Sequence, residues 1–135
     1  MDTHMKHTVT TFIQQQLSPV FLMVFGSYAS GNIHPRSDLD LAFFKTHIPI
    51  DAYTRFTLAQ ELAGLLNLEK VDLIDLSSVS TIFRAEILSS GALLSCSNSD
   101  FFDTYHATAL SMYAHLNEKM APVLKEIQES RRIYG

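Results

Sequence analysis

Two aspartates stand two positions apart in an otherwise apolar segment, at Asp38 and Asp40, and they follow the pair Gly26-Ser27 after ten intervening residues. In a β-strand, residues i and i+2 point to the same face, so these carboxylates project together, about 6–7 Å apart along the chain. Two covered carboxylates are tolerable mainly when a cation lies between them. Oxygen ligands at short spacing suit Mg²⁺ or Mn²⁺, so the segment predicts a divalent metal site.

A third carboxylate from a neighbouring strand would complete a site for two metal ions, and the segment VDLID at 71–75 offers Asp72 and Asp75. The two are three positions apart, so a regular strand points them to opposite faces of the sheet. Asp72 lies between apolar residues, where an unpaired carboxylate is costly, whereas Asp75 stands close to the polar Ser77-Ser78 and to water. We therefore predict Asp72 as the third metal ligand.

Gly26 and Ser27 suit the phosphate half of such a site. Glycine lets the backbone approach a ligand closely, and a serine hydroxyl donates to phosphate oxygens. Arg36, in the loop before Asp38, is a further candidate for phosphate binding. Together these residue types predict metal-assisted transfer of a phosphate-containing group, with catalysis by charge neutralisation and in-line positioning.

These residues need a sheet to position them, and hydrophobic patterning predicts one. Apolar runs at 20–25, 38–44 and 71–76 indicate strands, and Ala92–Cys96 indicates a short edge strand. Helices are expected over 4–17, over 52–66 with a broad apolar face that includes Tyr53, Phe56 and Leu65, and from Ser77 or Ser80 to Ser90. Gly91 is expected to end that last helix in the left-handed conformation. The fold class is α/β (α+β), a small mixed sheet of three to four strands flanked by helices.

From Asp100 onward the pattern is helical again, with an apolar stripe from Phe102 to Ile127. Pro122 lies inside the stripe and removes a backbone donor, so a kink or a restart is expected near Ala121. A helix over 101–131 would be about 45 Å long, which overhangs a domain of this size. Its far half must therefore bury its apolar face on a partner or on a second copy.

The 135 residues, 47% of them hydrophobic, predict one globular domain and exclude disorder. The net charge of −4 argues against a large basic surface, so direct binding of nucleic acid is not expected. The longest apolar run, Val20 to Phe25, is too short to cross a membrane. A single cysteine, Cys96, and the lack of an apolar leader point to the cytoplasm.

The segment FGSYASGNIHPRSDLDL resembles the signature of the DNA polymerase β-type nucleotidyltransferase superfamily, and VDLIDL resembles its third-carboxylate strand. The short chain is similar to the minimal nucleotidyltransferases (MNT), with a core over about 20–96. The resemblance implies that Asp38, Asp40 and Asp72 hold two Mg²⁺ ions and that ATP is the substrate. It further implies an antitoxin that moves AMP, with release of pyrophosphate, to a hydroxyl, expected to be a tyrosine, of a HEPN-domain RNase toxin in a hetero-oligomer.

One departure from the family pattern concerns Ser30, where many members carry an arginine associated with the triphosphate. Two alternatives to the toxin-modifying enzyme stay open, and the Ser30 departure supports the first. In the first, the chain is a catalytically weak or inactive antitoxin that neutralises its toxin by binding alone. In the second, it is a small-molecule nucleotidyltransferase such as those that modify aminoglycosides, although the sequence supplies no additional segment to bind a drug.

Overall fold

The computed structural model describes the backbone of residues 1–34, 37–46 and 49–134, and the side chains of these ranges apart from 123, 124 and 127–134. Its centre is a mixed sheet with the strand order β3-β2-β1-β4, formed by β1 (Phe21–Phe25), β2 (Leu39–Phe44), β3 (Val71–Asp75) and β4 (Ala92–Cys96). Strand β1 pairs antiparallel with β2 and with β4, and β2 pairs parallel with β3. The four strands and their mixed arrangement confirm the predicted fold.

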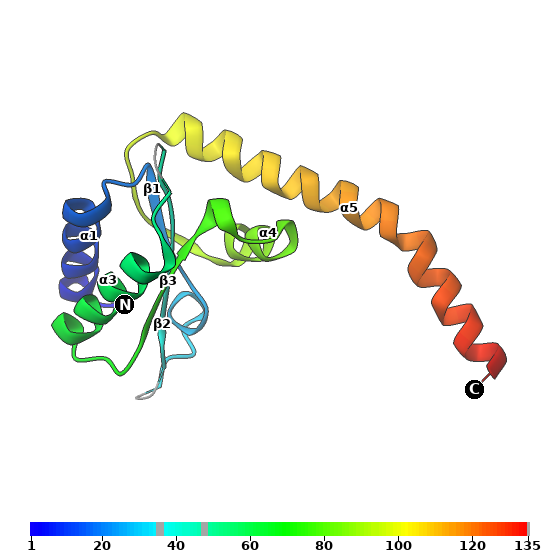
Figure 1. Ribbon diagram of the computed structural model, residues 1–135, viewed down its shortest axis with the longest axis horizontal. Coiled ribbons are helices and arrows are strands. Elements are labelled where there is room, and N and C mark those ends of the chain that lie inside the picture. The colour runs from blue at the N-terminus through cyan, green and yellow to red at the C-terminus, as the bar shows by residue number, and fades with distance from the viewer. Residues whose placement is uncertain (35–36, 47–48, 135) are drawn as a thin grey trace.

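Helices cover both faces of this sheet (Figure 1). Helices α1 (Thr3–Leu17) and α3 (Ala52–Leu66) lie on one face, and α4 (Thr81–Ser90) and the start of α5 (Ser99–Tyr134) lie on the other. A single turn, α2 (Ser27–Ser30), follows β1, and a short 3₁₀ turn, η1 (Leu76–Ser78), follows β3.

The two sides of β2 contribute to two separate cores because successive side chains of a strand point to opposite faces. Leu39, Leu41 and Phe43 pack in the core under α1 and α3. Ala42 and Phe44 pack under α4 and α5. Asp40 shares the parity of Ala42 and Phe44, so its carboxylate lies on the α4–α5 side of the sheet.

Helix α4 begins at a serine cap and ends at a glycine, but that glycine differs from the prediction. The side chain of Ser80 accepts a hydrogen bond from the amide of Phe83, so Ser80 rather than Ser77 caps the helix. Gly91 is extended, with φ −80° and ψ 170°, so the expected left-handed conformation is wrong. A Cβ at Gly91 would lie 2.6 Å from the carbonyl oxygen of Ile87 and 3.0 Å from that of Val24. Glycine is therefore needed here to let the helix end pack closely against β1.

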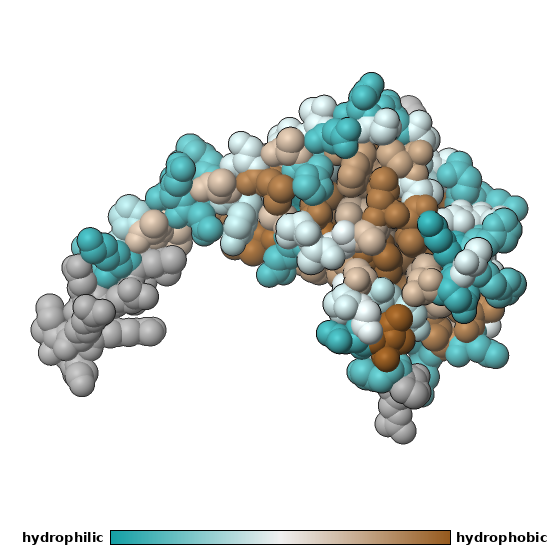
Figure 2. All heavy atoms as spheres, turned by 180° about the vertical axis from the view of Figure 1, so that it is seen from behind, coloured by the Kyte–Doolittle hydropathy of each residue, from teal (hydrophilic) through white to brown (hydrophobic). Residues whose placement is uncertain are grey.

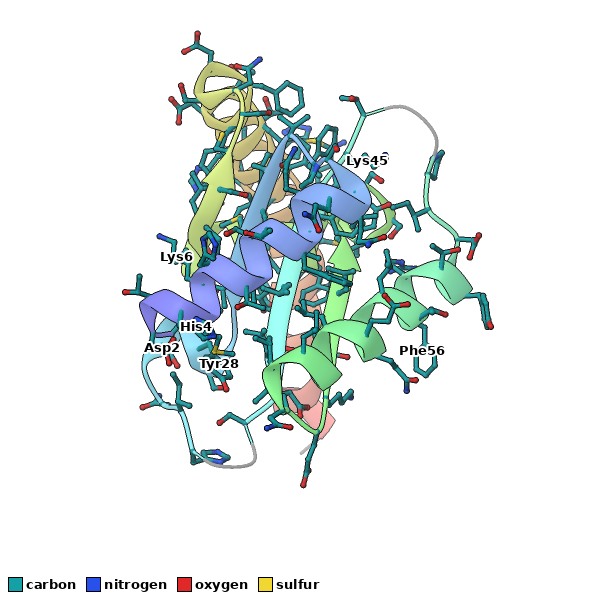
Figure 3. All side chains as sticks on the ribbon, turned by 90° about the vertical axis from the view of Figure 1, so that its left-hand side faces the viewer. Asp2, His4, Lys6, Tyr28, Lys45 and Phe56 are labelled. Carbon is teal, nitrogen blue, oxygen red and sulfur yellow. The ribbon has the colours of Figure 1, made fainter. Side chains whose placement is uncertain are left out.

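Helix α3 has the predicted bounds but a narrower buried face than expected. Only four of its residues are buried, namely Leu58, Ala59, Leu62 and Ala63. Tyr53, Phe56 and Leu65, which were expected in the apolar face, are exposed. Phe56 points outward from α3 in the view of Figure 3. A 15-residue helix on one edge of a small sheet has a single contact face, which the wide apolar pattern overestimates.

Helix α5 is continuous over 36 residues, with Pro122 inside it, so the alternative of a restart is wrong. Figure 1 shows the helix leaving the body and bending in its second half, as a missing donor near Pro122 would allow. Met112 and Met120 are exposed on the projecting part. In Figure 2, brown apolar side chains interrupt the teal ones along this part of the helix. Within the described ranges, no helix combines the length and the apolar character needed to cross a bilayer.

Candidate active site

Asp40 and Asp72 are brought together by the parallel pairing of β2 with β3, in which they are register partners. Partners in a parallel pair point to the same face, so the two carboxylates lie side by side on the α4–α5 side of the sheet. Burial is the main cause that raises the pKa of Asp40 to about 6, and the adjacent Asp72 carboxyl, which shares a hydrogen bond with it, is the next. Asp72, chosen over Asp75 from its apolar flanks and the resemblance, is thus the neighbour of Asp40, and its role as a metal ligand stays a prediction.

Asp38 and Lys70 complete the charges around this pair. Asp38 directly precedes β2 and raises the pKa of Asp40 further by repulsion, while Lys70 lowers it. The Nζ of Lys70 lies 3.7 Å from Oδ1 of Asp72, with the two side chains 60% and 39% exposed. An ion pair this exposed contributes little stability. Among the described residues that act on the pKa of Asp40, two further carboxylates are therefore opposed by the single exposed cation of Lys70.

Gly26 forms the floor beneath Asp40. Phe25, the residue before it, is the register partner of Asp40 across β1 and β2. A Cβ built on Gly26 would collide with Oδ2 of Asp40 and would lie 3.2 Å from its Cγ. Gly26 also has φ +68° and ψ −146°, a region that only glycine adopts readily. The glycine of the motif is thus required by both the backbone and the carboxylate above it.

Ser27 opens the short helix α2, next to this floor. Gly26 caps that turn without a side chain, so no side-chain acceptor covers its first amides. Ser30 donates its hydroxyl to the carbonyl of Ser27 within the same turn. The position that departs from the family pattern is therefore used in local structure. Phosphate binding by Gly26 and Ser27 stays a prediction, and Arg36 lies outside the described residues.

Asp75 has the opposite environment from the one that the sequence suggested. Its side chain is buried, with 6% of the residue exposed, whereas the side chain of Asp72 is 39% exposed. Oδ1 of Asp75 accepts hydrogen bonds from the amide of Ser77 at 2.9 Å and from its hydroxyl at 2.7 Å. The expectation that Asp75 reaches water and that Asp72 is covered was wrong, because burial alternates along the edge strand β3: Val71, Leu73 and Asp75 are buried, whereas Asp72 is on the partly exposed face.

The possible metal ligands near Asp40 are carboxylate oxygens, which is the ligand type that Mg²⁺ and Mn²⁺ prefer. In the ranges that the structure describes, no three His, Cys, Asp or Glu side chains are close enough together to hold a metal ion as they are placed. Asp40 and Asp72 form the near pair, and Asp38 acts on it from farther away. The residues fit a divalent cation chemically, since a cation would remove the repulsion within the pair.

Two features of this neighbourhood were not found from the sequence. Lys70 pairs with Asp72, and its position directly before Val71-Asp72 was the available signal. The second feature is a groove beside Gly26 whose wall includes Phe83 and Glu86 of α4. Those two residues stand three positions apart, so they share a face of the helix.

Comparison with known proteins defines the class of this fold and site. Residues 7–100 match the family model described as polymerase beta, nucleotidyltransferase. The chain therefore belongs to the polymerase beta nucleotidyltransferase family, as its Gly-Ser and Asp-x-Asp residues indicated. Its described part has the four-stranded sheet that places Gly26, Asp40 and Asp72 on neighbouring strands.

Particular relatives are an adenylyltransferase and chains of toxin–antitoxin structures. The chain is 32% identical over 106 residues to the protein adenylyltransferase MntA of Shewanella oneidensis, which covers 78% of this chain and 74% of that protein. It is similar to a chain of a toxin–antitoxin crystal structure with AMP-PNP, with 27% identity, a TM-score of 0.81 and coverage of 91% and 98%. The fold is shared with a chain of the complex between a tri-AMPylated Shewanella oneidensis HEPN toxin and its MNT antitoxin, with 24% identity, a TM-score of 0.79 and coverage of 95% and 99%.

Proposed function

We propose that this chain is an antitoxin that transfers AMP from ATP, with Mg²⁺, to a tyrosine hydroxyl of a HEPN-domain toxin. The observation that carries the proposal is the carboxylate pair Asp40–Asp72 on the floor made by Gly26. Support comes from the relative that is a protein adenylyltransferase and from the similar complex that contains AMP-PNP. The HEPN partner and its AMP groups are those of the solved complex that shares this fold.

The proposed reaction forms one bond and breaks one bond at the α-phosphorus of ATP. The tyrosine oxygen attacks that phosphorus, pyrophosphate leaves, and the hydroxyl proton passes to solvent on the exposed side of Asp72. Asp38, Asp40 and Asp72 would hold the Mg²⁺ ions, which supply charge neutralisation for the phosphates. Gly26 keeps Asp40 in place, and Gly26 and Ser27 would border the phosphates.

The test is transfer of label from ATP labelled at its α-phosphate to the HEPN-domain toxin that the proposal assigns as the partner of this chain. Labelled toxin is expected with Mg²⁺ and not with EDTA. Asp40→Asn should lose the label, whereas Glu69→Gln, an exposed carboxylate three positions before Asp72, serves as the matched control and should keep it. A toxin that stays unlabelled with the native chain would refute the enzyme.

A second candidate, neutralisation by binding alone, is favoured by Ser30, whose hydroxyl is used within α2 instead of supplying a positive charge. The amount of antitoxin needed separates the two. An enzyme neutralises at substoichiometric amounts with ATP, and the toxin stays inactive after the antitoxin is removed. A binding antitoxin needs about one copy per toxin or per toxin dimer, and its effect disappears on separation.

We also propose that the toxin binds along the projecting part of α5. Ala109 is buried at the root of the helix, whereas Met112 and Met120, which continue the stripe, are exposed. Their burial requires a surface from another chain. Hydrogen exchange over 112–122 should slow when the toxin is added, and unchanged exchange there would move the interface elsewhere.

A further inference from the structure

A groove of about 380 Å³ lies between the end of β1 and helix α4, next to the carboxylates. Its lining includes Phe25 and Gly26 from the end of β1 and Phe83, Glu86 and Ser90 from α4. The ring of Phe25 meets the ring of Phe83 edge-on, with centroids 6.0 Å apart and planes at 81°. Phe83 is nevertheless exposed. We call this hollow the α4 groove.

The α4 groove and the carboxylate pair share Gly26. This residue lines the groove, and it also forms the floor on which Asp40 lies. Asp40 and helix α4 are on the same side of the sheet, since Ala42, two residues after Asp40, packs in the core under α4. A ligand that is bound at Asp40 and continues past Gly26 therefore reaches Phe83.

The chemistry of the groove lining separates the two ends of a nucleotide. Among the described residues that line it, none is Lys, Arg or His, and Glu86 is the only charged one. With no second carboxylate in the described lining to hold a cation, the charge of Glu86 disfavours the triphosphate in this hollow and leaves it to the uncharged end of the nucleotide. An aromatic ring beside a hydrogen-bond acceptor suits an uncharged planar base that carries an amine.

Glu86 supplies the charged acceptor for that amine. The hydroxyls of Ser89 and Ser90 both donate to the main-chain carbonyl of Glu86, at 3.2 and 2.7 Å, so these donors are used within the helix. The Glu86 side chain is exposed. The volume of the α4 groove also fits a nucleoside, because pockets of about 300–1,000 Å³ are the usual size for small ligands.

We propose that the nucleoside of ATP lies in the α4 groove, with the adenine ring against Phe83 and its exocyclic amine donating to the carboxylate of Glu86. The proposal rests on the proposed function, because it assigns the base end of the same nucleotide whose phosphates face Asp40. It makes Phe83 a binding residue and Glu86 a residue that selects adenine.

The chain contains no tryptophan, so Phe83→Trp creates a single fluorescent reporter in the groove. Mg-AMP-PNP should quench its emission saturably, and inorganic triphosphate should not. Tyr53→Trp, which places the reporter at an exposed position of α3 on the opposite layer, is the control and should not respond. A saturable response in the Tyr53→Trp chain, or none in the Phe83→Trp chain under conditions where calorimetry detects binding, would overturn the proposal.

Affinities of the full chain separate this proposal from the proposed function. Phe83→Leu should weaken Mg-AMP-PNP about tenfold and leave inorganic triphosphate unchanged, because only stacking is lost. The native chain should prefer ATP over inosine triphosphate, which carries a carbonyl in place of the amine, by about tenfold, and Glu86→Gln should reduce this preference to less than about threefold. Equal binding of AMP-PNP by the native and Phe83→Leu chains would overturn only the assignment of the nucleoside to the α4 groove. No binding of AMP-PNP by the native chain would overturn the proposed function itself.

Discussion

The two ends of strand β3 each carry an aspartate, and their surroundings differ in kind. At the C-terminal end, far from Asp40, Asp75 is buried and its carboxylate accepts two hydrogen bonds from Ser77. At the near end, Asp72 is half-exposed, but it lies against the like charge of Asp40. Local hydrogen bonds satisfy the first carboxylate, and the second needs a positive charge from outside the chain or from the exposed Lys70.

This contrast shows that burial alone does not identify a functional carboxylate. A buried acid with its own donors is a structural group, since its hydrogen bonds compensate for lost hydration. A less buried acid beside another acid is a ligand-binding group, because repulsion is relieved only by a cation. The predictions below test whether the two ends of β3 have these separate roles.

The largest expected effect is on transfer at the near end. Asp40→Asn and Asp72→Asn should each lower the rate of AMP transfer about 10³-fold or more. Each variant removes a negative charge that would hold the Mg²⁺ ions which neutralise the phosphates. Labelled transfer to the toxin measures the rate, and circular dichroism checks the fold. Full transfer by both variants would contradict the metal site.

Gly26→Ala is expected to lower transfer about a hundredfold. The new methyl group would collide with the Asp40 carboxylate. The backbone of the alanine would also have to adopt a positive φ, which alanine disfavours. Gly31→Ala is the matched control, because Gly31 has φ +83° but nothing within 4 Å of an added Cβ. Equal losses in the two variants would show that backbone strain, not the collision with Asp40, is responsible.

Asp75→Asn should affect stability more than transfer. Asparagine can still accept from Ser77, but it loses the charge that strengthens those bonds, so unfolding should become easier by about 1 kcal/mol, or roughly 4 °C in Tm. Transfer per folded molecule should change less than about threefold. An inactive Asp75→Asn chain beside an active Asp72→Asn chain would reverse the assignment of the two ends.

The smallest expected effect is on the pH dependence of stability. Burial and the neighbouring Asp72 raise the pKa of Asp40 to about 6, so folding favours its protonated form. This contribution to stability is present below about pH 4 and is lost as the pH rises through 6. With EDTA, the Tm of Asp40→Asn should therefore be about 2 °C above that of the native chain at pH 7.5, a small difference because solvent screens the partly exposed carboxylates. At pH 4 the two Tm values should be equal. A Tm difference that is the same at both pH values would contradict the repulsion between Asp40 and Asp72.

Much of the sheet could be predicted from the sequence, because apolar runs between glycines and polar turns determine strands locally. Strand parity showed only that one of Asp72 and Asp75 could face Asp40. The argument that chose Asp72, its relative burial, was wrong about both residues, although Asp72 is the register partner of Asp40. Burial along β3 depends on strand order, which decides which residues are at an edge. Pairing between distant segments sets that order, and no local pattern contains it.

The remaining differences also depend on tertiary packing. The exposure of Phe56 depends on how α3 lies on the sheet, and the conformation of Gly91 depends on the carbonyl of Val24, far away in sequence. The α4 groove is formed by residues of β1 and α4 that are about sixty positions apart in the chain. Patterns within a single element cannot show such contacts.

The most direct test of the central role of the Asp40–Asp72 pair is the intact mass of the HEPN toxin after incubation with ATP, Mg²⁺ and a substoichiometric amount of this chain. The expected result is toxin that carries one or more AMP groups and is inactive, with unmodified and active toxin when the double variant Asp40→Asn, Asp72→Asn is used. Toxin that is neutralised without any change in mass, equally well by the native chain and by the double variant, would contradict it.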